Sequence, residues 1–223
     1  MFIGHYGVAL ALKRAEPTVS LGTLVAAAAF VDLLWVVFVL VGWEQVYITP
    51  HVLPASNFEF IDYPLSHSLV AAVVWAVVVG AVYYSWPTRD TGRHFRAAAV
   101  VGLAVASHWF IDLIVHVPDL PLAGNDSPKL GLGLWRSVPA TLLVELLAFG
   151  LGLAIYVRYA STKHPVRPVR LVIWAALLVG LFFANIFGPP PPSFQAVFWG
   201  VVIGAPIFIG LAAWADKTMA ASR

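Results

Sequence analysis

The sequence predicts an all-α fold, a polytopic helical membrane bundle with about six transmembrane helices and a short N-terminal helix. Composition is the first observation behind this prediction. Of 223 residues, 61% are hydrophobic and 11% are charged, whereas a soluble domain has about 25% charged residues. The second observation is a series of apolar stretches long enough to cross the roughly 30 Å core of a bilayer. The third is that all Lys and Arg residues except Lys129 and Arg136 fall in loops on one side of these stretches.

The expected elements follow one another along the chain. The six predicted spans are residues 21–42, 67–86, 97–117, 138–159, 169–187 and 194–215. Residues 43–66 are expected to form a polar loop, and residues 118–137 a loop rich in Gly and Pro. Gly188 and the four prolines after it make a tight connection to the last span, which Pro206 is expected to kink. Residues 1–223 therefore form one integral membrane domain without a separate soluble part.

The N-terminal segment is apolar but short. Residues 1–12 carry only His5 and Tyr6 as polar groups, and Lys13 ends the segment. About 12 residues cannot cross a bilayer, and no basic residue precedes the apolar run, so a signal peptide is not expected. Two interpretations stay open: a terminus at the membrane interface, or a half-helix that dips into the bundle and carries His5 inward.

Charge also predicts location and partners. The positive-inside rule places both termini in the cytoplasm and makes the chain a multi-pass protein of the cytoplasmic (inner) membrane, with the lipid bilayer as its surroundings. The net charge of +2 and the scattered basic residues do not favour a nucleic-acid partner. The chain has no cysteine, which excludes disulfides, thiolate zinc sites and thiol catalysis. The sequence leaves the oligomeric state open.

Three ionisable residues lie four apart in the third span. His108, Asp112 and His116 stand within an otherwise apolar run. Each step of four residues advances about 400° and 6 Å along a helix, so all three side chains share one face. Ionisable groups at this depth are costly and indicate a functional site. The His-Asp-His stripe predicts metal ligands, with helix packing or a proton relay as the alternatives.

Depth in the membrane suggests which other residues join the stripe. Asp32 and His108 each lie about 16 Å from the cytoplasmic face, and His5 reaches a similar depth if its segment inserts. His67 lies at the outer end of its span, level with His116. The set is therefore expected to form a column that opens toward the outer side. His67 and Asp32 are expected to be too far apart for one ion, unless the chain dips inward at Pro64.

The predicted metal ligands are His5, Asp32, His67, His108, Asp112 and His116. Lys and Arg occur inside the predicted spans only as Arg158 and Arg170, each one residue from the cytoplasmic end of its span, so Asp32 and Asp112 have no basic partner at their depth. Imidazole and carboxylate groups suit a divalent metal, most often zinc, and the stripe has room for one or two ions. A metal-bound water is a nucleophile near neutral pH, which makes hydrolysis the expected chemistry.

Three further carboxylates are candidates for catalytic roles. Asp62 and Asp119 lie beside prolines at the expected outer mouth, where turn formation is the alternative explanation. Glu145 lies inside the fourth span, where it either orients a ligand or is a neutral buried carboxyl group. Ser66 is expected to cap the helix that follows it.

The chain resembles the bacterial membrane-bound metal-dependent hydrolases, a family of the inner membrane. The pieces that carry the resemblance are Gly4-His5-Tyr6, Asp32-Leu33-Leu34-Trp35, Asp62-Tyr63-Pro64-Leu65-Ser66-His67-Ser68-Leu69, Ser107-His108-Trp109-Phe110-Ile111-Asp112 and His116-Val117-Pro118-Asp119-Leu120-Pro121. That family is distantly similar to zinc-dependent phospholipase C. The resemblance implies one metal held by Asp32, His67, His108 and Asp112, and another held by His5 and a bridging Asp112. The later His-x-x-x-Glu of the phospholipase group is missing here.

These observations leave three functional hypotheses. The first is a membrane-embedded hydrolase that uses a metal-activated water on an ester or phosphoester, most plausibly lipid-linked. The second is a metal-ion or proton-coupled transporter that uses the same His and Asp residues, which broken helices or inverted repeats would favour. The third is a non-catalytic membrane scaffold whose polar residues fix helix packing.

Overall fold

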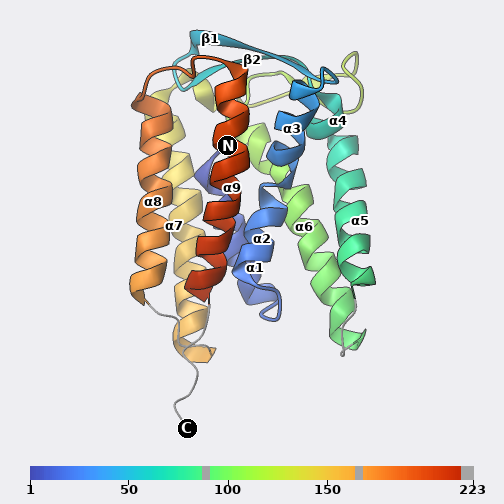
Figure 1. Cartoon of the computed structure of the whole chain (residues 1–223), viewed down its shortest axis with the longest axis vertical. Coiled ribbons are helices and arrows are strands. Elements are labelled where there is room, and N and C mark those ends of the chain that lie inside the picture. Colours follow the sequence, from blue (N-terminus) through green and yellow to red (C-terminus); the bar gives the residue numbers. More distant parts are fainter. Residues whose placement is uncertain (87–90, 164–167, 217–223) are drawn as a thin grey trace.

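The structure, a computed structural model, describes residues 1–86, 91–163 and 168–216, and it is a mostly helical bundle (Figure 1). The helices are α1 (Ile3–Ala15), α2 (Leu21–Ala28), α3 (Phe30–Leu40), α4 (Pro64–His67), α5 (Leu69–Ser85), α6 (Thr91–Val115), the short 3₁₀ helix η1 (Leu134–Arg136), α7 (Val138–Lys163), α8 (Pro168–Phe187) and α9 (Phe194–Asp216). The long helices run roughly parallel, and the strands and most loops gather at the upper end in the view of Figure 1. The prediction of a mostly helical bundle with several apolar, membrane-type helices is confirmed.

Helices stand at all six predicted spans, but they differ in length. Four helical segments are long and apolar enough to cross a membrane: His94–Val115, Val138–Ala160, Pro168–Phe187 and Phe194–Asp216. The first predicted span is broken into α2 and α3, which meet at an angle of 45° and together make a fifth candidate. Helix α5 is apolar but has only 17 residues. Length and composition of the described residues therefore support four or five crossings, and the count of six stays a prediction.

Helix α1 is a half-helix inside the bundle and not an interfacial terminus. Figure 1 places the N-terminus in the upper half of the bundle, with α1 running from there toward the lower end. It packs against α7, α2 and α6, and His5 on it is 2% exposed. Gly7 and Gly152 allow the close approach of α1 to α7, because a Cβ on Gly152 would overlap the carbonyl group of Gly7. The second interpretation of the N-terminal segment is the one that the structure shows.

A buried polar network holds the lower end of α1. The ammonium group of Lys13 donates to Asp216 Oδ2 at 2.7 Å and to the carbonyl oxygens of Pro17 and Val19 at 3.0 and 2.8 Å. Asp216 also accepts hydrogen bonds from the hydroxyl of Tyr156 at 2.9 Å and from the backbone amide of Leu21 at 3.0 Å. Four segments of the chain are thereby tied together at one point.

Both segments that were expected to be loops contain β-strands. Residues 45–62 form an antiparallel hairpin of β1 (Gln45–Leu53) and β2 (Ser56–Asp62), with Val46 opposite Phe60 and Ile48 opposite Phe58. These β-branched and aromatic residues were the available signal for strands. Within 118–137, the two-residue strands β3 (Leu120–Pro121) and β4 (Lys129–Leu130) pair before η1. The hairpin covers the upper end of the bundle (Figure 1).

The basic residues divide between the two ends as the loop alternation predicts. Those at the lower helix ends include Lys13, Arg14, Arg96, Arg158 and Arg170, whereas Lys129 and Arg136 lie in β4 and η1 at the upper end. The predicted basic positions 89, 167, 217 and 223 lie outside the described residues. The assignment of the basic end to the cytoplasm stays a prediction.

Candidate metal centre

All six predicted ligands meet in one buried cluster around the carboxylate of Asp112. They come from four separate helices or their ends: His5 from α1, Asp32 from α3, His67 from α4, and His108, Asp112 and His116 from α6 and the residue that follows it. Oδ2 of Asp112 lies 3.1 Å from Nε2 of His108 and 3.8 Å from Nε2 of both His67 and His116. Oδ1 of Asp112 lies 3.1 Å from Nε2 of His5 and also contacts the Met1 amine. The arrangement is a compact cluster, not the expected column.

Asp32 shares two histidines with Asp112. Its Oδ1 lies 3.5 Å from Nε2 of His108 and 3.6 Å from Nε2 of His67. Of the two possibilities left open by the sequence, these distances agree with the one in which the chain dips inward at Pro64. The single turn of α4, which begins at Pro64, carries His67 into the bundle, where it is 3% exposed. The inward dip at Pro64 is the reason that both residues reach one site.

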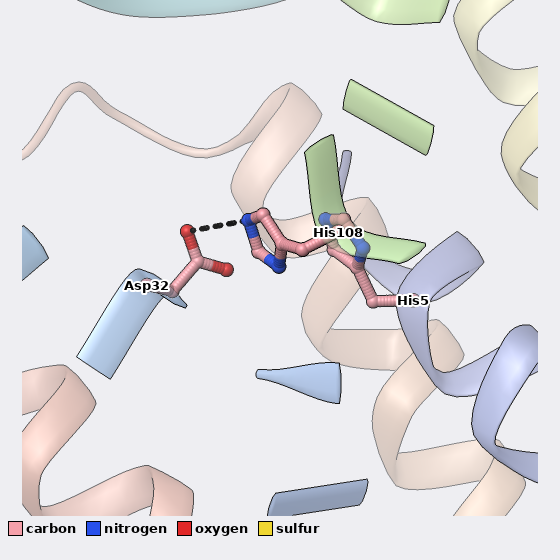
Figure 2. Close-up of side chains that lie close together, drawn as sticks. All are labelled: His5, Asp32 and His108. Atoms are coloured by element: carbon pink, nitrogen blue, oxygen red, sulfur yellow. Dashed lines mark ion pairs between the residues drawn. The ribbon is translucent and has the colours of Figure 1, made fainter. Parts of the chain in front are cut away.

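The break between α2 and α3 orients His108. A backbone carbonyl group can only accept, so Nδ1 of His108 carries a proton and donates it to the Ala28 oxygen at 2.8 Å. Ala28 is the last residue of α2, at the 45° bend. Within the part of the chain that the structure describes, Nε2 of His108 makes no hydrogen bond, although carboxylate oxygens of Asp112 and Asp32 lie 3.1 and 3.5 Å away. Figure 2 shows the ring of His108 between Asp32 and the stacked ring of His5.

Two other histidines, like His108, have Nδ1 hydrogen-bonded to an acceptor outside the cluster. Nδ1 of His116 donates to Oδ1 of Asp119 at 2.9 Å. Nδ1 of His67 lies 2.7 Å from Oγ of Ser66, whose own proton goes to Oε2 of Glu44 at 2.6 Å. The proton of each ring is thus held on Nδ1 by an acceptor outside the cluster, and each Nε2 faces the carboxylates. Metal-binding histidines in proteins are oriented in this way.

His5 enters the cluster differently. Its ring stacks on that of His108, with centroids 3.9 Å apart and an interplanar angle of 5°, and its Nδ1 has no hydrogen-bond partner. Glu145 accepts the backbone amides of Phe2 and Gly4 at 2.6 and 2.8 Å. The carboxylate therefore caps the N-terminal end of α1, as an acidic group does at a helix start. This contact fixes the position of His5.

The other two candidate catalytic carboxylates are placed differently from each other. Asp119 is one residue short of β3 and holds His116, so it orients a ligand. Asp62 is the last residue of β2 and pairs through its backbone with Gln45. Oδ1 of Asp62 is buried without a hydrogen-bond partner in the described part of the chain. No contact joins Asp62 to the cluster among the described residues.

The cluster lacks basic side chains and is almost closed. Within the described residues, the ion pairs of Asp32 and Asp112 are made with histidine rings and the Met1 amine, and with no Lys or Arg side chain. The side chain of Asp32 is 44% exposed, whereas those of the other five ligands are 3% exposed or less. The cluster is therefore reached at Asp32.

Aromatic rings cover the end of the cluster where the outer mouth was expected. The ring of Trp135 lies 4.1 Å from that of His116, and the ring of Phe60 from β2 lies 5.0 Å from it. Trp35 packs edge-on to His67 with ring centroids 6.4 Å apart. The exposed carboxylate of Asp32 lies one helical turn before Trp35 on α3.

The donor set fits a divalent metal. Two groups, His5–Asp32–His108 and His67–His108–Asp112, each bring three ligand atoms within 4.8 Å of one another. Imidazole nitrogen and carboxylate oxygen are the ligands of zinc and of its borderline neighbours. His108 belongs to both groups but has only Nε2 free, so it serves one ion at a time. The described residues could therefore offer either of these three-ligand groups to an ion, but not both groups at once.

Glu44 and Ser66 were not found as functional residues from the sequence. Ser66 does not cap α5, because the hydroxyl of Ser68 accepts the Ala71 amide and performs that role. Glu44 is 1% exposed and accepts two hydrogen bonds from Ser66, at 2.7 Å from its amide and 2.6 Å from its hydroxyl. Burial raises the pKa of Glu44, and the hydrogen bonds from Ser66 oppose that rise. No short-range pattern links residue 44 with residue 66.

Comparison of this chain with protein-family models, with curated proteins and with solved structures found no match.

Proposed function

We propose that this protein is a membrane-embedded metal-dependent hydrolase that cleaves an ester or phosphoester of a lipid-linked substrate. The observation that carries the proposal is the orientation of three histidines. Each has its Nδ1 proton held by an outer acceptor and turns Nε2 toward Asp112, and two of them, His67 and His108, also turn it toward Asp32. No Lys or Arg of the described residues neutralises these carboxylates, although Asp112 also pairs with the Met1 amine. A nitrogen lone pair facing a carboxylate is unfavourable unless a proton or a cation lies between them.

The proposed ligands are Asp32, His67, His108 and Asp112, with His5 and His116 available for a second ion. A divalent metal held by them, most often zinc, would polarise the ester carbonyl or phosphoryl group and acidify a bound water. Asp32 is the ligand with an exposed side chain, so a substrate would reach the ion beside it. Asp119, Glu44 and Glu145 are assigned positioning roles, because Asp119 contacts the ligand His116, whereas Glu44 and Glu145 bind residues next to His67 and His5.

The surroundings of Asp32 favour a lipid-linked substrate. Its helix α3 carries the exposed apolar side chains Val37 and Leu40, and neighbouring α9 exposes Ile203. In a bilayer these surfaces face acyl chains. The proposed placement has six crossings in the cytoplasmic membrane, formed by α2–α3 together and by α5 to α9, with the basic helix ends in the cytoplasm.

The experiment combines metal content with turnover. Protein purified in detergent and loaded with zinc is analysed for bound metal, then assayed on chromogenic phosphodiester, phosphomonoester and carboxylester substrates and on phospholipid micelles. Asp112→Asn keeps the shape of the side chain and should lose both metal and turnover. Asp126→Asn, at an exposed loop position, is the matched control and should retain both. Metal content in Asp112→Asn equal to that of the wild type would contradict the proposal.

A metal-ion or proton-coupled transporter is the second candidate, favoured by a specific observation. Transporters use broken helices and half-helices at mid-membrane ion sites, and this bundle has both, in the α2–α3 bend and in α1. Proteoliposomes loaded with a zinc-sensitive dye separate the two candidates. Zinc flux without turnover of any ester favours the transporter, and turnover without flux favours the hydrolase. A scaffold would show neither, and His108→Ala would then change stability alone.

A further inference from the structure

We infer that Glu44 is a positioning residue of the proposed metal centre, which acts through the hydroxyl of Ser66 to keep the proton of His67 on Nδ1. This inference rests on the proposed function for its metal readout, although the protonation of His67 is measurable without metal. Glu44 lies outside the helical core of the bundle, between α3 and β1, and it makes no direct contact with Asp32 or Asp112.

The local fold brings Glu44 over Ser66. Helix α3 ends at Leu40, and Gly42 takes a left-handed conformation with φ of 79°, as glycine does after a helix end. The amides of Trp43 and Glu44 both donate to the Phe38 oxygen, at 2.8 and 3.2 Å, so the chain folds back on the helix. Glu44 is thereby buried to 1% exposure against the first turn of α4.

The direction of the hydrogen bonds follows from the donors and acceptors present. Oε1 of Glu44 accepts the Ser66 amide at 2.7 Å, and Oε2 accepts the Ser66 hydroxyl at 2.6 Å. Two other acceptors lie near that hydroxyl: the Tyr63 oxygen, more distant at 3.5 Å, and Nδ1 of His67 when it carries no proton. A hydroxyl proton directed at Nδ1 would leave Oγ and the carboxylate Oε2 at 2.6 Å without a proton between them, so the proton points at Glu44. A serine hydroxyl has one proton, and once that proton points at Glu44, Oγ can only accept from Nδ1 of His67 at 2.7 Å. Nε2 of His67 is then left with its lone pair toward Asp32 and Asp112.

Glu44→Gln should reverse the direction of the hydrogen bonds from residue 44 through Ser66 to His67. The amide of glutamine has one oxygen and one NH₂ group, and the Ser66 amide requires the oxygen. The NH₂ group would then face Oγ of Ser66 and donate to it, and the hydroxyl would donate to Nδ1 of His67. The proton of His67 would move to Nε2, where it blocks metal binding. Ser66→Ala removes the hydrogen bonds through the hydroxyl without reversing their direction, and Ser66→Thr keeps a hydroxyl at this position.

The test measures zinc affinity by competition with a chelator, and the proton position on His67 by NMR of isotope-labelled histidine in metal-free protein. Outer partners of this kind change metal affinity by about 10–100-fold, so Glu44→Gln should weaken zinc binding by about that factor and move the His67 proton to Nε2. Ser66→Ala should weaken binding less, and Ser66→Thr should match the wild type. Glu59→Gln, on the exposed face of the neighbouring hairpin, is the control and should change neither quantity.

Each outcome decides the inference. A Glu44→Gln protein with wild-type zinc affinity and an Nδ1 proton on His67 would overturn it. If Glu44→Gln does not fold, Ser66→Ala with unchanged affinity would overturn it instead. If the wild-type protein binds no zinc, the proposed function fails, but the NMR comparison still tests Glu44. A proton that moves between wild type and Glu44→Gln supports the inference, and one that stays on Nδ1 overturns it.

Discussion

Two buried polar clusters hold α1, one at each of its ends, and they differ in how their charges are balanced. At the lower end, the three ammonium protons of Lys13 all have oxygen partners, and Asp216 accepts from Lys13, Tyr156 and the Leu21 amide. At the upper end, Asp32 and Asp112 face histidine nitrogens and the Met1 amine, and Nε2 of His108 lacks a hydrogen bond. The first cluster is complete as it stands. The second has the composition of a site that receives a cation.

The comparison has a physical consequence. A complete network acts as a structural tie, so each of its members is needed at all times and no added ion should change its strength. A cluster with excess carboxylate should be less stable alone than with its cation. The two clusters should therefore respond in opposite ways to metal and to neutralisation of their carboxylates.

The largest expected effect is at the lower cluster. Lys13→Met leaves Asp216 buried without its cation, and loss of one partner of a buried ion pair costs about 3–5 kcal/mol of unfolding free energy. Arg14→Met changes the neighbouring basic residue, which is exposed, and should have little effect. Thermal unfolding in detergent measures the stability of both variants. Equal stability of the two variants would show that the lower cluster is not a structural tie.

Metal should stabilise the upper cluster by a comparable amount. Zinc that binds the folded state alone adds about 2.7 kcal/mol at a free concentration 100 times the Kd. A chelator should therefore lower the unfolding temperature of the zinc-loaded wild type and of Lys13→Met, but not that of Asp112→Asn. If the chelator lowers the unfolding temperature of Asp112→Asn as much as that of the wild type, zinc binds at another site.

The packing of α1 on α7 provides a smaller effect that reaches the metal site. Gly152→Val puts a side chain where the backbone of Gly7 lies, and overpacking of this kind costs about 1–3 kcal/mol. Gly150→Val, on the same helix, has open space and should be tolerated. Zinc affinity should fall in the first variant because α1 carries His5. Wild-type zinc affinity in a folded Gly152→Val protein would show that His5 is not a zinc ligand.

Gly42→Ala should have a still smaller effect on stability. Alanine disfavours the φ of 79° at this position and costs about 1 kcal/mol, although the added Cβ meets no neighbouring atom. A shift of the chain at Gly42 moves Glu44, so zinc affinity should fall together with stability. Gly124→Ala, at an open loop glycine without positive φ, is the control. Unchanged values for Gly42→Ala would mean that the turn does not place Glu44.

The smallest effect has the opposite sign. In metal-free protein, Asp32→Asn removes the carboxylate that is paired only with histidine rings among the described residues, whereas Asp112 also pairs with the Met1 amine, so the unfolding temperature should rise slightly. The rise is small because the same change also weakens the contacts of Asp32 with His67 and His108. Asp216→Asn weakens the Lys13 pair and should lower the unfolding temperature in the same buffer. A fall in both variants would mean that the upper cluster is already balanced without metal.

Much of the bundle and of the site followed from local sequence patterns. Apolar length located the helices, and the spacing of His108, Asp112 and His116 placed them on one face, since both depend only on neighbours along the chain. Equal depth correctly paired Asp32 with His108. Depth failed for His67, because it assumed a straight span where the chain makes a separate turn at Pro64.

The parts that the sequence did not reveal depend on contacts between distant residues. Glu44 and Ser66 meet only because α3 folds back at Gly42, and Glu145 reaches Phe2 and Gly4 only because α1 enters the bundle. The hairpin was missed for another reason. Prolines in residues 43–66 favoured a loop, and the pairing of Val46 with Phe60 outweighs them.

The most direct test of the central claim is an anomalous-scattering experiment at the zinc edge on crystals of the zinc-loaded protein. We expect a peak bounded by Nε2 of His67 and His108 and by the carboxylates of Asp32 and Asp112, at about 2.0–2.2 Å from its ligands. Absence of a peak there, with Nε2 of His108 hydrogen-bonded to a carboxylate, would contradict the claim that these carboxylates require a cation.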